Sequence, residues 1–238
     1  MRRKTVKILS VIVTLLTAVI IVLWQLFFAE TTSFYLVSVI ILLVSMIPFM
    51  FSFEKSSPSA RELALIAVLI SLAVASRAVF YLVPQFKPIG AVVIASAVCL
   101  GAERGYIIGA FSAFVSNFIF GQGIWTPFQM VALGLVGFFA GVIFKKLRTN
   151  KWTLSIVGFI LTFALYGVIV DASSVIFIAD EFTWSAALAI YAAGVPFSAI
   201  FGGATVLFLF LFGEEFIKKL NRINIKYGIT EDHYEKQK

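Results

Sequence analysis

The sequence predicts an all-α integral membrane protein with eight transmembrane helices. Of its 238 residues, 61% are hydrophobic and 13% are charged, whereas an ordinary soluble domain carries about 25% charged residues. The apolar residues form eight runs, most of them close to the roughly 20 residues that a helix needs to cross a hydrocarbon core. Lysine and arginine lie between these runs in a pattern that indicates one orientation across the membrane.

The eight runs differ in length. The runs at 89–100, 105–120 and 129–144 are short and rich in glycine, so we expect at least one of these helices to tilt little or to stop inside the protein. The predicted spans are residues 8–28, 34–53, 63–82, 89–100, 105–120, 129–144, 152–170 and 185–212.

The basic residues predict that both termini are cytoplasmic. With a cytoplasmic N-terminus, every basic cluster between the spans falls on the same side, and the outer loops hold only Lys87, apart from Arg77 inside a helix. A cleaved signal peptide over the first run would be unusually long and would leave the other spans in place. The cytoplasmic clusters lie at residues 2–7, 55–61, 104, 145–151 and 218–238.

Several functions are disfavoured by what the sequence lacks. One cysteine (Cys99) and one histidine (His233) allow no internal disulfide and no His/Cys metal cluster. The net charge of +7 is divided among short clusters, which argues against a nucleic-acid-binding face. There is no G-x-x-x-x-G-K-[ST] phosphate loop and no evident pairing of a nucleophile with a base, so we expect neither ATP hydrolysis nor another enzymatic activity.

Polar residues gather in three stretches that should meet at the outer surface. The first is SRAVFYLVPQFKP at 76–88, where Arg77 is costly in a helix unless it snorkels, pairs or faces a wet cavity. Tyr81 lies four residues later on the same face, and two prolines bracket Gln85 and Lys87. We interpret these side chains as ligand donors, with snorkelling of Arg77 as the alternative.

The second stretch, NFIFGQGIWTPFQM at 117–130, combines three amides, Asn117, Gln122 and Gln129, with Trp125. Each amide can donate and accept, which favours a lining for a polar ligand, although glycine, proline and an interfacial tryptophan would also suit an ordinary turn. The third stretch, at 171–184, begins with Asp171 at a predicted helix end. A carboxylate at the membrane interface is common without any function, so a role in ligand binding and an ordinary surface position are both open for Asp171. The candidate ligand-binding residues are Arg77, Tyr81, Gln85, Lys87, Asn117, Gln122, Trp125, Gln129 and Asp171.

Two stripes of small residues predict close helix packing, and we expect at least one of them to pack within the chain. Each stripe follows helical spacing on one face of its span. The first contains Ala60, Ala64, Ala67, Ser71 and Ala75, and the second contains Gly101, Gly105, Gly109, Ser112 and Ser116.

Residues 60–226 resemble the substrate-binding S components of energy-coupling factor (ECF) vitamin transporters. The segments ARELALIAVL, PQFKP, VSNFIFGQGIWTPFQM and LNRINIKYG carry the resemblance and look like a subgroup with two extra N-terminal helices. The resemblance implies a six-helix S-component core at 58–226. A two-helix extension at 1–57 would precede this core, and a polar cytoplasmic tail at 227–238 would follow it.

The resemblance also implies a function. An S component captures a vitamin from outside and works with a transmembrane T component and two ATPases, which hydrolyse ATP, so the chain itself needs no cofactor. In this family an alanine-rich face of the first core helix meets the T component, and here Ala60, Ala64 and the rest of the first stripe match it.

The substrate expected from the resemblance is cobalamin (vitamin B12), whose rim of amides suits asparagine and glutamine. Arg77, Lys87 and Asp171 would equally suit a smaller anionic vitamin such as pantothenate. The alternative from another class is a stand-alone membrane carrier, for which inverted repeats or mid-membrane charges would be expected.

Overall fold

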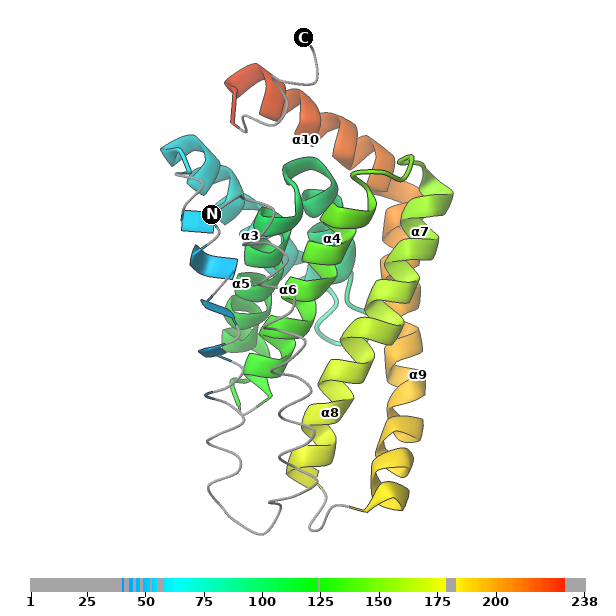
Figure 1. Ribbon diagram of the computed structural model, residues 1–238. Coiled ribbons are helices and arrows are strands. Elements are labelled where there is room, and N and C mark those ends of the chain that lie inside the picture. The colour runs from blue at the N-terminus through cyan, green and yellow to red at the C-terminus, as the bar shows by residue number, and fades with distance from the viewer. Residues whose placement is uncertain are drawn as a thin grey trace.

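The computed structural model describes residues 40, 43–44, 46–47, 49–51, 53–54, 58–123, 125–178 and 183–229, and within them every regular element is a helix (Figure 1). The predicted span at 8–28 lies outside the described residues, as do most of 34–53 and the end of the polar tail. The helices are α3 (Ala60–Val79), α4 (Ile89–Leu100), α5 (Ala102–Phe120), α6 (Thr126–Ile143), α7 (Lys151–Ile160), η1 (Leu161–Tyr166), α8 (Gly167–Ile178), α9 (Trp184–Phe208), η2 (Leu209–Gly213) and α10 (Glu214–Tyr227).

The lengths of these helices fit a protein that crosses a membrane several times. Four helical stretches among the described residues are long and apolar enough to span a bilayer: Ala60–Val79, Thr126–Ile143, Lys151–Phe177 and Trp184–Tyr227. In contrast, α4 has 12 residues, which is too short for a full crossing. That at least one of the short runs tilts little or stops inside the protein stays a prediction, which the length of α4 favours.

Local sequence signals mark the helix boundaries. The side chains of Ser59, Asn150 and Thr183 accept hydrogen bonds from backbone N–H groups in the first turns of α3, α7 and α9, respectively. Pro127 occupies the first turn of α6, where its missing N–H costs nothing. Gly228 ends α10 in the left-handed conformation. These caps explain why the observed bounds lie within a few residues of most predicted apolar runs.

The second stripe of small residues packs inside the chain, against α6. A Cβ added at Gly109 would lie 2.2 Å from the carbonyl oxygen of Leu133, and one added at Gly137 would lie 2.1 Å from that of Gly105. The backbones of α5 and α6 therefore touch directly, as small-residue stripes in membrane helices allow. This close pair forms the centre of the bundle.

The first stripe, on α3, does not pack within the described structure. All five of its residues are exposed there. The opposite face of α3 is held by other contacts, including those of buried Ile66, Leu69 and Ala73 in the core. At the start of α3, buried Glu62 accepts a hydrogen bond from Arg104 Nε, which ties α3 to the beginning of α5. The alanine stripe is thus not used for packing among the described helices.

Residues before α3 also contribute to the core. Phe49 is 1% exposed, and its ring stacks on Tyr106 of α5 at 3.8 Å between centroids with an interplanar angle of 7°. Phe138 of α6 meets the same ring edge-on at 5.3 Å. Met46 is buried in the same cluster. The described part of the second predicted span therefore packs against α5 and α6.

Two regions depart from the expected layout. The helix that begins at Lys151 continues through π-helical η1 to Ile178, so Asp171 lies inside α8 and not at a helix end as predicted. Val175 and Ile176 are buried and extend the helix, because they continue its buried surface. After η2, α10 turns and lies across one end of the bundle (Figure 1). Part of the basic cluster predicted at 218–238 is therefore an amphipathic helix.

Candidate functional site

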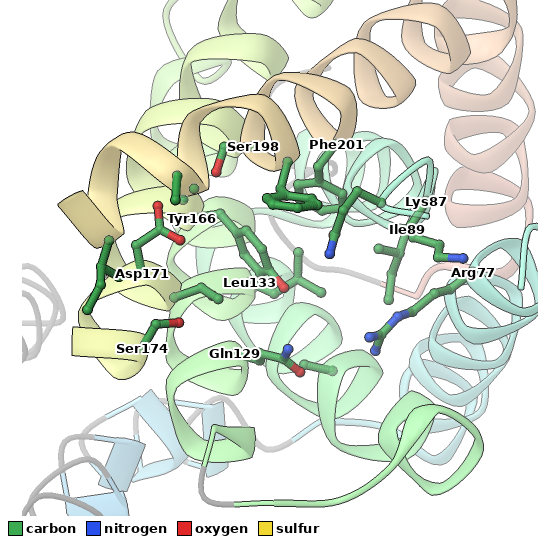
Figure 2. Close-up of a pocket in the computed structure, with 18 residues that line it drawn as sticks. Arg77, Lys87, Ile89, Gln129, Leu133, Tyr166, Asp171, Ser174, Ser198 and Phe201 are labelled. Atoms are coloured by element: carbon green, nitrogen blue, oxygen red, sulfur yellow. The ribbon is translucent and has the colours of Figure 1, made fainter. Parts of the chain in front are cut away.

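A cavity of about 410 Å³ lies in the half of the bundle away from α10 and is lined by residues of α3, α4, α5, α6, η1, α8 and α9 (Figure 2). This volume is within the range of small-molecule sites, about 300–1,000 Å³. Apolar side chains such as Ile89, Leu133, Phe197 and Phe201 form much of its wall. Its polar lining residues are Arg77, Gln85, Lys87, Gln129, Tyr166, Asp171, Ser174 and Ser198.

Arg77, in the last turn of α3, projects into one side of the cavity. One of its terminal nitrogens, Nη1, donates to Ser116 Oγ and to Asn117 Oδ1, the latter at 2.9 Å. Its guanidinium carbon lies 4.2 Å from the ring centroid of Phe120, a cation–π contact. Because Nε and Nη2 have no partner among the described residues, the guanidinium retains donors for a ligand.

Lys87 approaches the same side from the loop between α3 and α4. Its ammonium donates to the backbone carbonyls of Phe80 and Tyr81, at 3.1 Å for Tyr81, and so occupies the carboxyl end of α3. Burial, and then the nearby charge of Arg77, lower the pKa of Lys87 from its usual value. Gln85 in the same loop has φ = 55°, a strained conformation that holds its side chain at the cavity.

A hydrogen-bonded network behind Arg77 joins α5 to α6. Asn117 is 1% exposed, and its Nδ2 donates to Gln129 Oε1 at 2.8 Å and to Thr126 Oγ1 at 3.2 Å. Thr126 in turn donates to Gln122 Oε1 at 2.9 Å and accepts from the backbone N–H of Gly123 at 3.1 Å. The predicted turn at 117–130 is therefore cross-linked by its own amides.

The opposite side of the cavity carries acceptors and hydroxyls. Asp171, Ser174 and Ser198 project from α8 and α9 (Figure 2). Asp171 packs over Gly194, where an added Cβ would lie 2.3 Å from Asp171 Oδ2. No described residue donates a hydrogen bond to the Asp171 carboxylate. A half-buried carboxylate without a donor is expensive unless a bound molecule or water satisfies it.

Aromatic side chains stand between the two sides. Tyr166 is the last residue of η1, and its ring lies 4.7 Å from that of Phe201 on α9 with an interplanar angle of 38°. A π-helical turn shifts the register of the residues that follow it, and such turns often occur at functional sites. Here the shifted helix presents Tyr166 and Asp171 to one cavity.

Five of the nine predicted ligand-binding residues line this cavity: Arg77, Gln85, Lys87, Gln129 and Asp171. The other four do not. Tyr81 is exposed and packs on Phe120, and Trp125 is exposed and covers Gly123. Asn117 and Gln122 belong to the network behind the wall.

The sequence analysis missed Tyr166, Ser174, Ser198 and the phenylalanines of the wall. A polar residue in an apolar run was the available signal for Tyr166 and Ser198, but single serines and tyrosines are common in membrane helices. Their significance depends on the approach of α8 to α9, where a Cβ at Gly167 would meet Ser198 Oγ at 2.6 Å.

The arrangement is suited to binding. Among the described residues there is no group of three or more His, Cys, Asp or Glu side chains that could hold a metal ion. The lining offers cationic and amide donors on one side, a carboxylate and hydroxyls on the other, and aromatic rings between them. Such a site can orient an elongated, partly aromatic molecule that has acceptors at one end and hydroxyls at the other.

Comparison with known proteins identifies a family. A family model described as "ECF-type riboflavin transporter, S component" matches residues 57–214, which is more than half of the chain. Neither the curated proteins nor the solved structures gave a significant match.

Proposed function

Because this chain belongs to the S-component family of ECF-type transporters, we propose that it captures riboflavin from outside the cell for ATP-driven uptake. S components are transport proteins of the cell membrane that cross it several times, and they are not enzymes. The expectations that the chain is a multi-pass protein of the cell membrane and is not an enzyme are therefore confirmed. The vitamin itself is the part that we propose.

Riboflavin replaces the cobalamin expectation. The matching family model is of the riboflavin type and gives no support to cobalamin, so it favours the alternative of another vitamin. The cavity of about 410 Å³ also suits a flavin-sized molecule better than a corrinoid, which is much larger.

The observation that carries the proposal is the division of the cavity into two chemically different sides. Arg77, Lys87 and Gln129 offer donors that suit the carbonyl and imine acceptors of an isoalloxazine ring. Asp171, Ser174 and Ser198 suit the hydroxyls of a ribityl chain. Tyr166 and Phe201 supply aromatic surface for the flat ring system.

The charge distribution supports a cavity that opens outward. The basic residues of the α6–α7 connection and of α10 lie at the end of the bundle opposite the cavity (Figure 1). Since lysine and arginine are enriched in cytoplasmic segments, that end is assigned to the cytoplasm. The vitamin would then enter from outside, and both termini would be cytoplasmic as the sequence predicts.

The exposed alanine stripe of α3 is the proposed contact for the T component. S components of ECF transporters generally act with a T component and ATPases. Ala60, Ala64, Ala67, Ser71 and Ala75 are all exposed, so another helix could approach this face closely. Phosphate-loop ATPases would supply the energy that this chain has no motif to supply.

Titration of the purified protein with riboflavin tests the substrate. Flavin fluorescence should be quenched saturably, because stacking on Tyr166 and Phe201 gives the excited ring a path of decay that it lacks in water. Cobalamin and pantothenate are titrated by calorimetry in parallel. Binding of either one, with no response to riboflavin, would refute the substrate proposal while leaving the family unchanged.

A further inference from the structure

We propose that Asn117, which does not line the cavity, determines which atom of the Gln129 amide faces the ligand. Through its hydrogen bond to Gln129, Asn117 makes Arg77 and Gln129 a pair that offers only donors to the cavity, and this pair receives carbonyl groups of the ligand's ring. The assignment of those carbonyl groups to a flavin rests on the proposed function. Asn117 is then a positioning residue that acts on specificity through Gln129.

The polarity of the network starts at Arg77. A guanidinium has five donors and no acceptor, so the Asn117 atom that meets Arg77 Nη1 at 2.9 Å must be the oxygen. The other Asn117 atom is therefore Nδ2, a donor. This assignment follows from the chemistry of arginine and does not depend on distinguishing oxygen from nitrogen in the amide.

The orientation of Asn117 in turn fixes Gln129. Asn117 Nδ2 must meet an acceptor, so the Gln129 atom at 2.8 Å is Oε1. The remaining Gln129 atom is Nε2, which has no acceptor among the described residues. In Figure 2 the nitrogen of Gln129 is directed toward the cavity and its oxygen away from it. Gln129 therefore offers the ligand N–H donors.

Thr126 prevents the network from reversing. Its Oγ1 accepts from Asn117 Nδ2 at 3.2 Å and from the backbone N–H of Gly123 at 3.1 Å, so its own proton goes to Gln122 Oε1 at 2.9 Å. Rotating the Asn117 amide by half a turn would place N–H against N–H at Arg77 and oxygen against oxygen at Thr126. At a site that is 1% exposed, such unsatisfied contacts are strongly unfavourable.

This polarity predicts how an elongated ligand lies in the cavity. Arg77 and Gln129 each offer only donors, so the end of the ligand beside them carries acceptors. Asp171, across the cavity, offers only acceptors when ionised and takes the end that carries hydroxyls. For a flavin, the carbonyl edge of the ring lies at α3 and α6, and the ribityl chain lies at α8 and α9.

The test measures how Gln129→Ala changes riboflavin affinity, because this change should have opposite signs with and without Asn117→Asp. In the unchanged protein, Gln129→Ala removes a donor and should weaken riboflavin binding roughly 10-fold or more. In Asn117→Asp, the carboxylate still accepts from Arg77 but cannot donate to Gln129, so the Gln129 amide turns and presents Oε1 to the ligand. Asn117→Asp should therefore weaken binding, and adding Gln129→Ala to it should strengthen binding relative to Asn117→Asp alone.

Lumiflavin, which has the ring but no ribityl chain, is titrated alongside riboflavin. Both ligands should respond alike to these variants, since they share the ring edge. A Gln129→Ala effect of the same sign in both backgrounds would overturn the proposed polarity. An effect on riboflavin alone would overturn the proposed orientation. No flavin binding by the unchanged protein would refute the proposed function, and with it this inference.

A second comparison covers the case in which Asn117→Asp does not fold, as judged by thermal unfolding without ligand. Gln129→Glu keeps the acceptor for Asn117 Nδ2 and puts an oxygen in place of Nε2. It should weaken flavin binding more than Gln129→Ala, although glutamate has the closer shape. If the glutamate variant bound as well as the alanine variant or better, Gln129 would not act as a donor and the inference would fail.

Discussion

The carboxylate of Asp171 on α8 lies against the backbone of Gly194 on α9, so closely that a methyl group at Gly194 would come within 2.3 Å of Asp171 Oδ2. The absence of a side chain at Gly194 thus leaves room for the carboxylate at the cavity wall. Both residues line the same cavity. The position of the proposed hydroxyl-binding group therefore depends on a neighbouring helix.

Gly194→Ala should weaken riboflavin binding by displacing Asp171 from this position. We expect a loss of about 1–3 kcal/mol, the cost of leaving a buried partner without its hydrogen bond. Fluorescence titration measures it. Gly203→Ala on the same helix is the matched control, because an added Cβ there meets nothing within 4 Å. Equal losses in the two variants would show that the effect comes from α9 itself and not from Asp171.

Asp171→Asn should show which end of the ligand lies beside Asp171. The amide keeps the shape of the carboxylate but loses the charge that strengthens its hydrogen bonds to hydroxyls, so riboflavin binding should weaken by about 1–3 kcal/mol. Lumiflavin lacks the hydroxyls and should bind unchanged. A similar loss for both ligands in calorimetry would place the ring, and not the ribityl chain, beside Asp171.

Ala67→Trp should interfere with coupling and leave vitamin binding intact. Ala67 is exposed on the alanine stripe, so a large side chain there obstructs a partner helix without entering the core. We expect reduced co-purification with the T component and reduced ATP-driven uptake. Leu72→Trp, at an exposed position about 100° around α3 from Ser71, the centre of the stripe, is the control and should retain both. Uptake at the normal level in Ala67→Trp would remove this face from the proposed interface.

Glu62→Gln should destabilise the protein by about 3 kcal/mol, because Arg104 would keep its charge in a nearly buried site without its partner. The midpoint of thermal unfolding in detergent should fall accordingly. The exposed pair of Glu215 and Lys218 on α10 provides the comparison, since Glu215→Gln should produce no measurable change. Equal behaviour of the two variants would mean that burial does not strengthen the Glu62–Arg104 pair.

The membrane helices were largely predictable because long apolar runs between basic clusters determine where a chain can cross a bilayer. The predicted run at 89–100 and observed α4 coincide, and α5 and α6 begin three residues before their runs. The extension through η1 to Ile178 was not predictable from hydropathy, since the polar residues after 170 resemble a loop. Their helical state depends on packing against α9.

The site was predictable in part. Arg77 and Asp171 stand out because ionisable groups are costly among apolar helices. Gln122 and Gln129 could not be distinguished by residue type, since both are amides of one turn. The hydrogen bonds of Thr126 and Asn117 place Gln122 in the network and Gln129 at the cavity. Tyr166 and Ser198 were missed because the approach of α8 to α9 gives them their role.

The stacking of Phe49 on Tyr106 has a consequence for how the chain is made. Phe49 leaves the ribosome before the helices that it packs against, and its partners Tyr106 and Phe138 lie 57 and 89 residues later in the sequence. Contacts between such distant residues cannot form until both have been synthesised. The segment that carries Phe49 can therefore reach its packed position only after α6 has been synthesised.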